Sequence, residues 1–330
     1  MRFTLAVPGL LALDPAMLAA APSLARLARY ASPHVTRRGA LDAFVVSGPA
    51  DGAAAGAAAL AALGAGLDPG KSYVLRADPV SLVAGRNDVA LAARIDDLDV
   101  DEAGAMIATL GAHFANDGLT FHAPRPDAWF IRQDVAPDLK TTPLASVRGP
   151  IYPWLPAGGD APRWRRWLSE MQMLLHAHPA NALREARGRV PVTGIWISDG
   201  GRVADLPQGS ATAIFAPAGR DGDVARGLAR LRGTAAAPPP DSFAALPAHD
   251  DAIVVLDGAT AANAPRMLSA WLDPAVMALE RGALASLSLL ADGGGTAAAW
   301  HAARPAWHVR TLARVTAPPF APPARDEDDT

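Results

Sequence analysis

The clearest pattern of apolar and polar positions lies between residues 160 and 199. Apolar side chains recur at helical spacing over 164–178, with polar side chains on the opposite side, so this stretch is predicted to be an amphipathic helix. Pro179 ends it, because a proline ring clashes with the preceding helical turn. We expect a second, short helix over 181–188 and then a mostly apolar strand over 190–197.

The rest of the chain alternates strands with helices at both ends and has a mixed segment in the middle. In that middle segment, period-two alternation predicts strands within 71–95, helical spacing predicts a helix over 99–114, and 119–132 is typical of a hairpin. At the two ends we predict strands at 2–7, 43–46, 212–215, 252–256, 285–290 and 307–315, and helices at 14–30, 223–231, 265–281 and one ending at 63.

This order of elements predicts an α/β protein with a three-layer core that is interrupted by a smaller α+β domain. We place the discontinuous core at 1–63 and 155–317 and the inserted domain at 64–154. The last segment, 318–330, is rich in proline and then acidic, so we expect a disordered tail.

Composition narrows the function classes. The 330 residues carry a net charge of −3, which gives no electrostatic reason to expect a nucleic-acid partner. The chain has no cysteine, which excludes disulfides, thiolate metal sites and cysteine nucleophiles and suits the cytoplasm. No uninterrupted apolar run reaches the roughly 20 residues that a membrane-spanning helix needs, so we expect no membrane partner.

Two aspartates each follow a predicted apolar strand. Asp257 precedes Gly258, and Asp292 precedes Gly293. Carboxylates at the carboxyl ends of sheet strands are where α/β proteins place ligands and metals. The alternative is that Asp-Gly is a common way for a chain to leave a strand.

The break between the two central helices gathers polar side chains. His178, Asn181, Arg184 and Arg187 lie around the start of the second helix, whose free N–H groups and positive dipole end favour an anion. We therefore predict a ligand site for an anion here. The alternative is a helix corner in which these side chains satisfy backbone groups.

Two stretches resemble the archaeal-type cofactor-independent phosphoglycerate mutases of the alkaline phosphatase superfamily. They are LLHAHPANALREARGRVPVTGIWISDGGRV and AALAALGAGLDPGKSYVLRADP, and the similarity covers about residues 58–200. Closer still, the chain resembles proteobacterial proteins described as RpfE-type regulatory proteins. The resemblance implies an alkaline-phosphatase-like core with an inserted domain.

The resemblance also implies chemistry: two divalent metals held by aspartates and histidines, and a serine that carries the phosphoryl group. The matching serine segment here is FVVSGPADGAA, which makes Ser47 the candidate nucleophile. Asp257 and Asp292 match metal-ligand positions, but the histidines of the family's motifs are missing after both. The resemblance therefore leaves these two aspartates as vestigial metal ligands.

From these observations we expect a catalytically degenerate, regulatory relative of the mutases. It would need no cofactor and would bind a small phosphorylated metabolite or a protein partner. The alternative is an active 2,3-bisphosphoglycerate-independent phosphoglycerate mutase, or a related phosphotransferase or phosphatase, which would need a divalent metal.

Overall fold

A computed structural model describes residues 1–36, 56–86, 88–206, 212–293, 296–316 and 318–323. The chain divides into two compact units, which we call unit 1 (Met1–Val45 and Gln208–Thr330) and unit 2 (Val46–Pro207). Unit 2 thus interrupts unit 1 along the sequence. The predicted strand at 43–46 lies outside the described residues. No helix of the described ranges is long and apolar enough to cross a bilayer.

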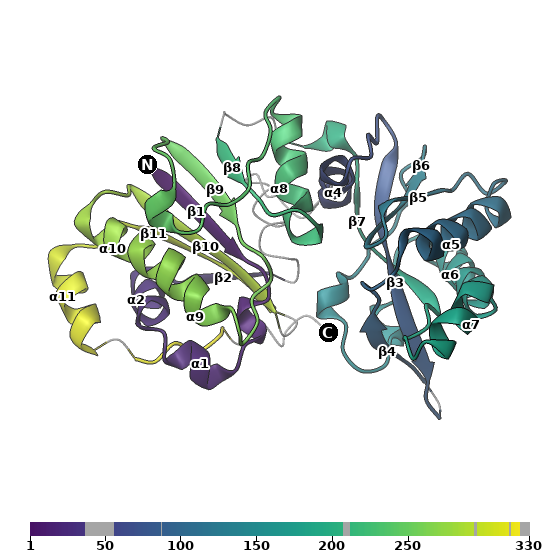
Figure 1. The fold of residues 1–330 in the computed structure, drawn as a ribbon, viewed down its shortest axis with the longest axis horizontal. Helices are drawn as coiled ribbons and strands as arrows, with labels where there is room; N and C mark the ends of the chain where they lie inside the picture. The colour runs from purple at the N-terminus through teal and green to yellow at the C-terminus, as the bar shows by residue number, and fades with distance from the viewer. Residues whose placement is uncertain (37–55, 87, 207–211, 294–295, 317, 324–330) are drawn as a thin grey trace. The chain divides into compact units, whose positions relative to one another are not determined.

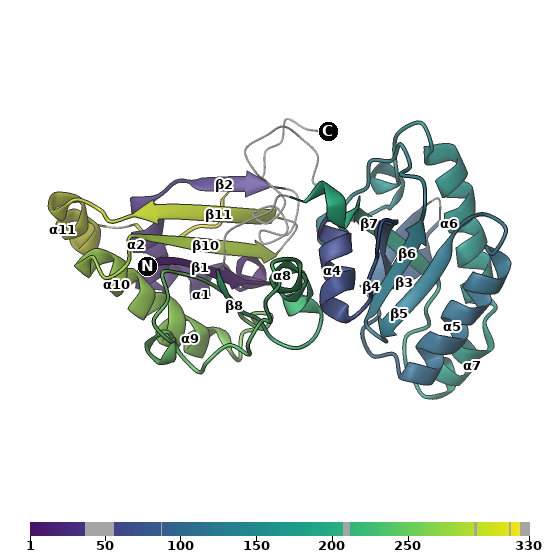
Figure 2. The same ribbon diagram turned by 90° about the horizontal axis from the view of Figure 1, so that it is seen from above.

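Unit 1 is built on a six-stranded sheet, as far as the described residues go, in the order β2-β11-β10-β1-β9-β8 (Figures 1 and 2). β8, β9, β1 and β10 are parallel, and β11 is antiparallel to both β10 and β2. The carboxyl ends of four strands therefore meet at one edge. The strands are β1 (Arg2–Val7), β2 (Pro33–Thr36), β8 (Ala213–Phe215), β9 (Asp251–Val255), β10 (Ser286–Gly293) and β11 (Thr296–Ala303).

Helices cover both faces of this sheet. On one face, alternate strand residues such as Val254 and Leu289 share a core with Leu24 of α2 and Val276 of α10. The residues between them on the strands, such as Ile253, face the other way, where α8 packs on β8 and β9. The predicted three-layer α/β core is confirmed. The helices are α1 (Pro15–Ala19), α2 (Pro22–Tyr30), α8 (Arg220–Leu231), α9 (Ala264–Met267), α10 (Asp273–Arg281) and α11 (Trp307–Thr316).

Unit 2 has a five-stranded antiparallel sheet in which β3 is central. The path is β4-β3-β6-β5, and β7 pairs with β3 alone. α4 lies on one face, and α5, α6 and α7 lie on the other (Figure 2). The elements are α4 (Ala57–Ala65), β3 (Tyr73–Ala84), β4 (Val89–Arg94), α5 (Val100–His113), β5 (Thr120–Arg125), β6 (Ala128–Gln133), α6 (Ala161–His176), α7 (Pro179–Ala186) and β7 (Gly194–Gly201).

Local sequence explains the helices of unit 2. The Asp99 carboxylate accepts the Glu102 N–H and the Glu102 carboxylate accepts the Asp99 N–H, which is a capping box at the start of α5. In α6, Trp164, Trp167 and Met171 are buried together with other residues at helical spacing. The two predicted helices around Pro179 are therefore confirmed.

The boundaries of the two units differ from the predicted ones. We assigned 155–207 to the core, but α6, α7 and β7 lie in unit 2. The reason is that β7 pairs with β3 over Val74–Val80, which ties the end of this segment to the sheet of unit 2. α4 likewise belongs to unit 2, whereas we had placed 56–63 in the core.

The C-terminal part of unit 1 corrects two further predictions. Residues 307–315 form helix α11 and not an edge strand, since Val309, Arg310 and Ala313 face inward at helical spacing. β11 was not predicted, and it takes the strand position next to β10. In the expected disordered tail, Phe320 is 5% exposed and packs on Trp300, with ring centroids 5.7 Å apart.

Candidate functional site

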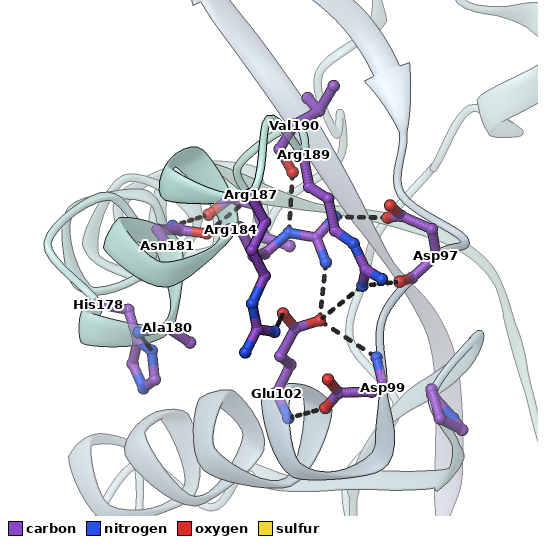
Figure 3. Close-up of polar contacts among 12 residues, drawn as sticks. Asp97, Asp99, Glu102, His178, Ala180, Asn181, Arg184, Arg187, Arg189 and Val190 are labelled. Atoms are coloured by element: carbon purple, nitrogen blue, oxygen red, sulfur yellow. Dashed lines mark hydrogen bonds and ion pairs between the residues drawn. The ribbon is translucent and has the colours of Figure 1, made fainter.

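The structure brings the four predicted anion-binding residues together at the corner between α6 and α7 (Figure 3). Arg184 is at the centre, and its side chain is 0% exposed. Its Nη1 donates to Oε2 of Glu102 at 2.8 Å, its Nη2 donates to Asp97, and its Nε donates to the carbonyl of Val190 at 2.9 Å. The guanidinium group is therefore used within the protein and is not offered to an external anion.

Asn181 and His178 hold the same corner through backbone groups. The Asn181 amide donates to the carbonyls of Leu175 and Val192, each at 2.7 Å, and accepts the Val192 N–H at 2.9 Å. His178 is the N-cap of α7: its Nδ1 accepts the Ala180 N–H at 3.2 Å, and its Nε2 lies 3.1 Å from the Thr109 hydroxyl. His178 therefore caps α7, and Asn181 ties the end of α6 to the segment that leads into β7.

Arg187 is the most accessible of the four residues. Its side chain is 57% exposed, and its Nη1 lies 3.9 Å from Oε1 of Glu102. Arg189 reaches the other oxygen of the same carboxylate at 3.9 Å. Three arginines thus surround one buried acid, which favours the alternative interpretation of this corner as a structural one.

The carboxyl edge of the unit 1 sheet gathers acidic side chains. Asp292 Oδ1 accepts the Gly9 N–H at 2.8 Å, and Asp221 Oδ2 accepts the Gly258 N–H at 2.9 Å. Burial, together with the nearby negative charge of Asp221, raises the pKa of Asp292 above its ordinary value. Asp257 is exposed. The carboxylates of Asp292 and Asp221 thus fasten the loops that follow β1 and β9.

The described residues do not fit a two-metal centre at this edge. No group of three or more His, Asp or Glu side chains within the described ranges could hold a metal ion. On this sheet, His301 pairs with Ser288 at 2.9 Å. Ser288 lies four residues before Asp292 on β10, about 13 Å away along an extended strand. Ser47, the predicted nucleophile, lies outside the described residues.

A buried polar cluster on β3 and β7 was not predicted. Arg76 and Ser198 pair across the two strands, and both are buried. The Ser198 hydroxyl donates to Asp199 Oδ2 at 2.9 Å, and the same oxygen lies 3.6 Å from Nε of Arg76. Asp199 has a φ of 57°, a conformation that few residues other than glycine adopt. Charged residues at alternate positions of a buried strand, Arg76 and Asp78, are the sequence signal for this cluster.

Unit 2 also contains a cavity of about 600 Å³ between β7 and α6. Its walls are mostly apolar and include Leu82, Ile151, Leu155 and Leu168. Its polar groups include Arg165, Ser169 and Gln172, which follow one side of α6, and Tyr152 faces the same space. An apolar cavity of this size with a few polar groups is typical of a ligand site.

Comparison with solved structures finds proteins of similar extent and low identity. A cofactor-independent phosphoglycerate mutase from Thermoplasma acidophilum is 17% identical with a TM-score of 0.38, covering 92% of this chain and 89% of that one. The PH0037 protein from Pyrococcus horikoshii is 15% identical with a TM-score of 0.44, covering 92% of this chain and 87% of that one. No family model matches the sequence, and no curated protein matches it.

Proposed function

We propose that the protein is a catalytically degenerate relative of the phosphoglycerate mutases that acts by binding a ligand, in a regulatory role of the RpfE type. The observation that carries this proposal is the use of the carboxylates at the unit 1 sheet edge. Asp292 and Asp221 each accept a backbone N–H from a loop, so their geometry is that of structural fasteners. The cavity of unit 2 supplies the space for a ligand.

The histidines support the same proposal. A phosphoryl-transfer site of this kind needs imidazole and carboxylate ligands around two cations. In unit 1, His301 and His34 lie on neighbouring strands, β11 and β2, and His301 faces Ser288 near the start of β10. Asp292 lies four residues beyond Ser288 along β10, and His34 lies two strands away from β10, level with Leu290.

Turnover of 3-phosphoglycerate tests the proposal, with the purified full chain, in Mn²⁺ and in Mg²⁺. We expect the wild type to match an Asp257→Ala variant, with no product formed beyond the level seen without protein. The metal content of the purified wild type is measured alongside. Stoichiometric bound metal together with activity that Asp257→Ala abolishes would overturn the proposal.

One observation favours the alternative, an active metal-dependent mutase or phosphatase. Asp292 is a half-buried carboxylate with a raised pKa beside a second acid, Asp221, and a divalent cation would relieve that repulsion. If the alternative holds, Mn²⁺ raises the melting temperature of the wild type and leaves that of Asp292→Asn unchanged. Equal melting temperatures with and without Mn²⁺ in both proteins count against it.

A further inference from the structure

The outer edge of β7 carries backbone groups without a partner strand. β7 lies beside β3 (Figure 1) and pairs with no other strand of the described residues. Ile195 is opposite Pro79, and the Pro79 carbonyl accepts the Ile95 N–H at 2.9 Å on the β4 side. The backbone of Pro79 therefore faces away from β7. In an antiparallel pair, opposite residues either both face each other or both face away.

It follows that Ile195, and Ile197 two residues on, direct their N–H and C=O groups away from β3. Neither residue has a backbone hydrogen bond to another segment of the described chain. Both are buried, at 4% and 2% exposure. Unpaired backbone groups in a buried place are rare in proteins because leaving them without a partner is costly.

Residues of this edge line the cavity of unit 2. Gly194, Ile195 and Ile197 line it, and four strand residues from Gly194 on span about 13 Å. The facing wall is α6. An edge strand and a helix on either side of an apolar groove form the arrangement that accepts an extended peptide as an added strand.

The cavity lining carries three charged side chains, Arg86, Asp88 and Arg165, of which two are positive. Arg165 belongs to α6. Its Nε donates to the Pro156 carbonyl at 3.0 Å, and its guanidinium carbon lies 5.9 Å from the centroid of the Tyr152 ring. These two contacts hold the side chain in place. Its two terminal nitrogens make no hydrogen bond to the described residues, so they are available to a carboxylate.

We propose that this groove, lined by β7 and α6, binds an extended peptide segment of a partner protein by strand addition. The peptide has apolar side chains at alternate positions and an acidic group that meets Arg165. This inference rests on the proposed function, because it names the class of partner that the protein would bind if it acts by binding and not by catalysis. The apolar side chains of the peptide fill the cavity. The peptide backbone forms hydrogen bonds with the unpaired N–H and C=O groups of Ile195 and Ile197.

The test begins with a phage-displayed heptapeptide library that contains every four-residue sequence, selected on the full-length protein. We expect recovered peptides to be rich in Val, Ile or Leu at alternate positions and to contain Asp or Glu. Each is synthesised with a fluorescein label, and its affinity is measured by fluorescence anisotropy. If no peptide is recovered, the proposal is overturned.

Backbone N-methylation of the recovered peptide separates strand addition from side-chain binding. Methylation of every second amide, in the register that faces β7, should lower the affinity at least about tenfold, since each methyl removes one donor and blocks pairing. Methylation in the other register should change it less than about twofold. Equal affinities for all methylated peptides would show that the peptide binds through its side chains without backbone pairing, and would overturn the proposal.

Two pairs of protein variants test the groove itself. Ile195→Pro removes the outward N–H without breaking the ladder to β3, and Ile195→Ala removes the side chain but keeps that N–H. We expect peptide binding to be lost in the first and kept in the second.

A second pair of variants tests the charged contact. Arg165→Ala should weaken peptide binding roughly tenfold to a hundredfold by removing a charge-assisted contact. The matched Arg166→Ala, on an exposed arginine outside the cavity, should leave it within about twofold.

Circular dichroism checks that each variant is folded. If Ile195→Pro does not fold, the N-methylated peptides alone test strand addition.

Failure of this inference can be distinguished from failure of the proposed function. Turnover of 3-phosphoglycerate with bound metal would remove the proposed function and leave peptide binding as measured. Unchanged binding by Arg165→Ala and Ile195→Pro would remove the groove proposal alone.

Discussion

At the scale of single residues, burial decides what each charged side chain does in this protein. Arg184 and Arg187 lie three residues apart on the same short stretch, yet one side chain is 0% exposed and the other 57%. Arg184 donates a hydrogen bond to Glu102 at 2.8 Å, whereas the nearest nitrogen of Arg187 lies 3.9 Å from the same carboxylate. The two residues therefore make different contributions to stability.

We predict that Arg184→Ala destabilises the protein by about 3–5 kcal/mol, because it leaves the buried carboxylate of Glu102 without its main partner. Arg187→Ala is the matched control and should cost within about 0.5 kcal/mol, as exposed surface substitutions do. Urea unfolding of both variants gives the two free energies. Equal losses would contradict the central place of Arg184 in the network.

A second residue-scale prediction concerns Asp292, whose folded pKa is raised above 3.8 by burial and by Asp221. The folded protein then holds this proton more tightly than the unfolded chain does. The free energy of unfolding therefore falls as pH rises from about 4 through the folded pKa, and the loss is complete above it. Asp292→Asn keeps an oxygen for the Gly9 N–H and removes the charge.

We expect Asp292→Asn to melt at a higher temperature than the wild type at pH 7 in EDTA, with the difference shrinking toward pH 4. Thermal melts across that range measure it. Asp257→Asn, which removes an exposed carboxylate that follows the neighbouring strand β9, is the matched control. A lower melting temperature of Asp292→Asn at pH 7 would mean that the ionised carboxylate is stabilising.

At the scale of elements, α6 packs against the core on one side and lines the cavity on another. One side packs Trp164, Trp167 and Met171 into the core of unit 2, and another presents Arg165 and Gln172 to the cavity. The helix therefore fixes one wall of the proposed peptide groove through its core contacts. Changes on the core side should reduce stability, whereas changes on the cavity side should alter binding.

We predict that Met171→Ala costs about 2–5 kcal/mol in the free energy of unfolding, because Met171 is 0% exposed and its loss leaves a cavity. Met173→Ala, two residues further along the same helix and 65% exposed, should stay within about 0.5 kcal/mol. Chemical denaturation compares them directly. Similar losses for both would mean that α6 is not packed as described.

At the scale of the whole molecule, each unit has its own sheet and its own core. The sheet of unit 2 is formed by strands from within 73–201, and its main core draws only on residues of that unit. A segment with an internal sheet and core meets the usual requirement for independent folding.

We therefore expect a chain of residues 56–206 to fold by itself. Its far-ultraviolet circular dichroism should show mixed helix and strand, and it should unfold in one cooperative transition. Loss of cooperativity, or exposure of apolar surface detected by dye binding, would show that unit 2 depends on unit 1. The full-length protein measured in parallel provides the reference.

The sequence by itself determined most of the local structure. Apolar spacing predicted α6, Asp99 predicted the start of α5, and Pro179 predicted the break before α7, because these signals act over one or two helical turns. The α/β class followed from the order of such elements. The residues of the α6–α7 corner were also predicted to lie together, and they do.

Only the tertiary structure decided what those residues do and where the units divide. β7 pairs with β3 across more than a hundred residues of sequence, as the contact of Leu82 with Thr193 shows. Helical or strand periodicity reports only on residues that are close in sequence, so it cannot predict which distant strands pair. It also cannot distinguish a buried arginine from an exposed one. The free edge of β7, and the cavity beside it, exist because strands remote in sequence pair on one side and leave the other unpaired.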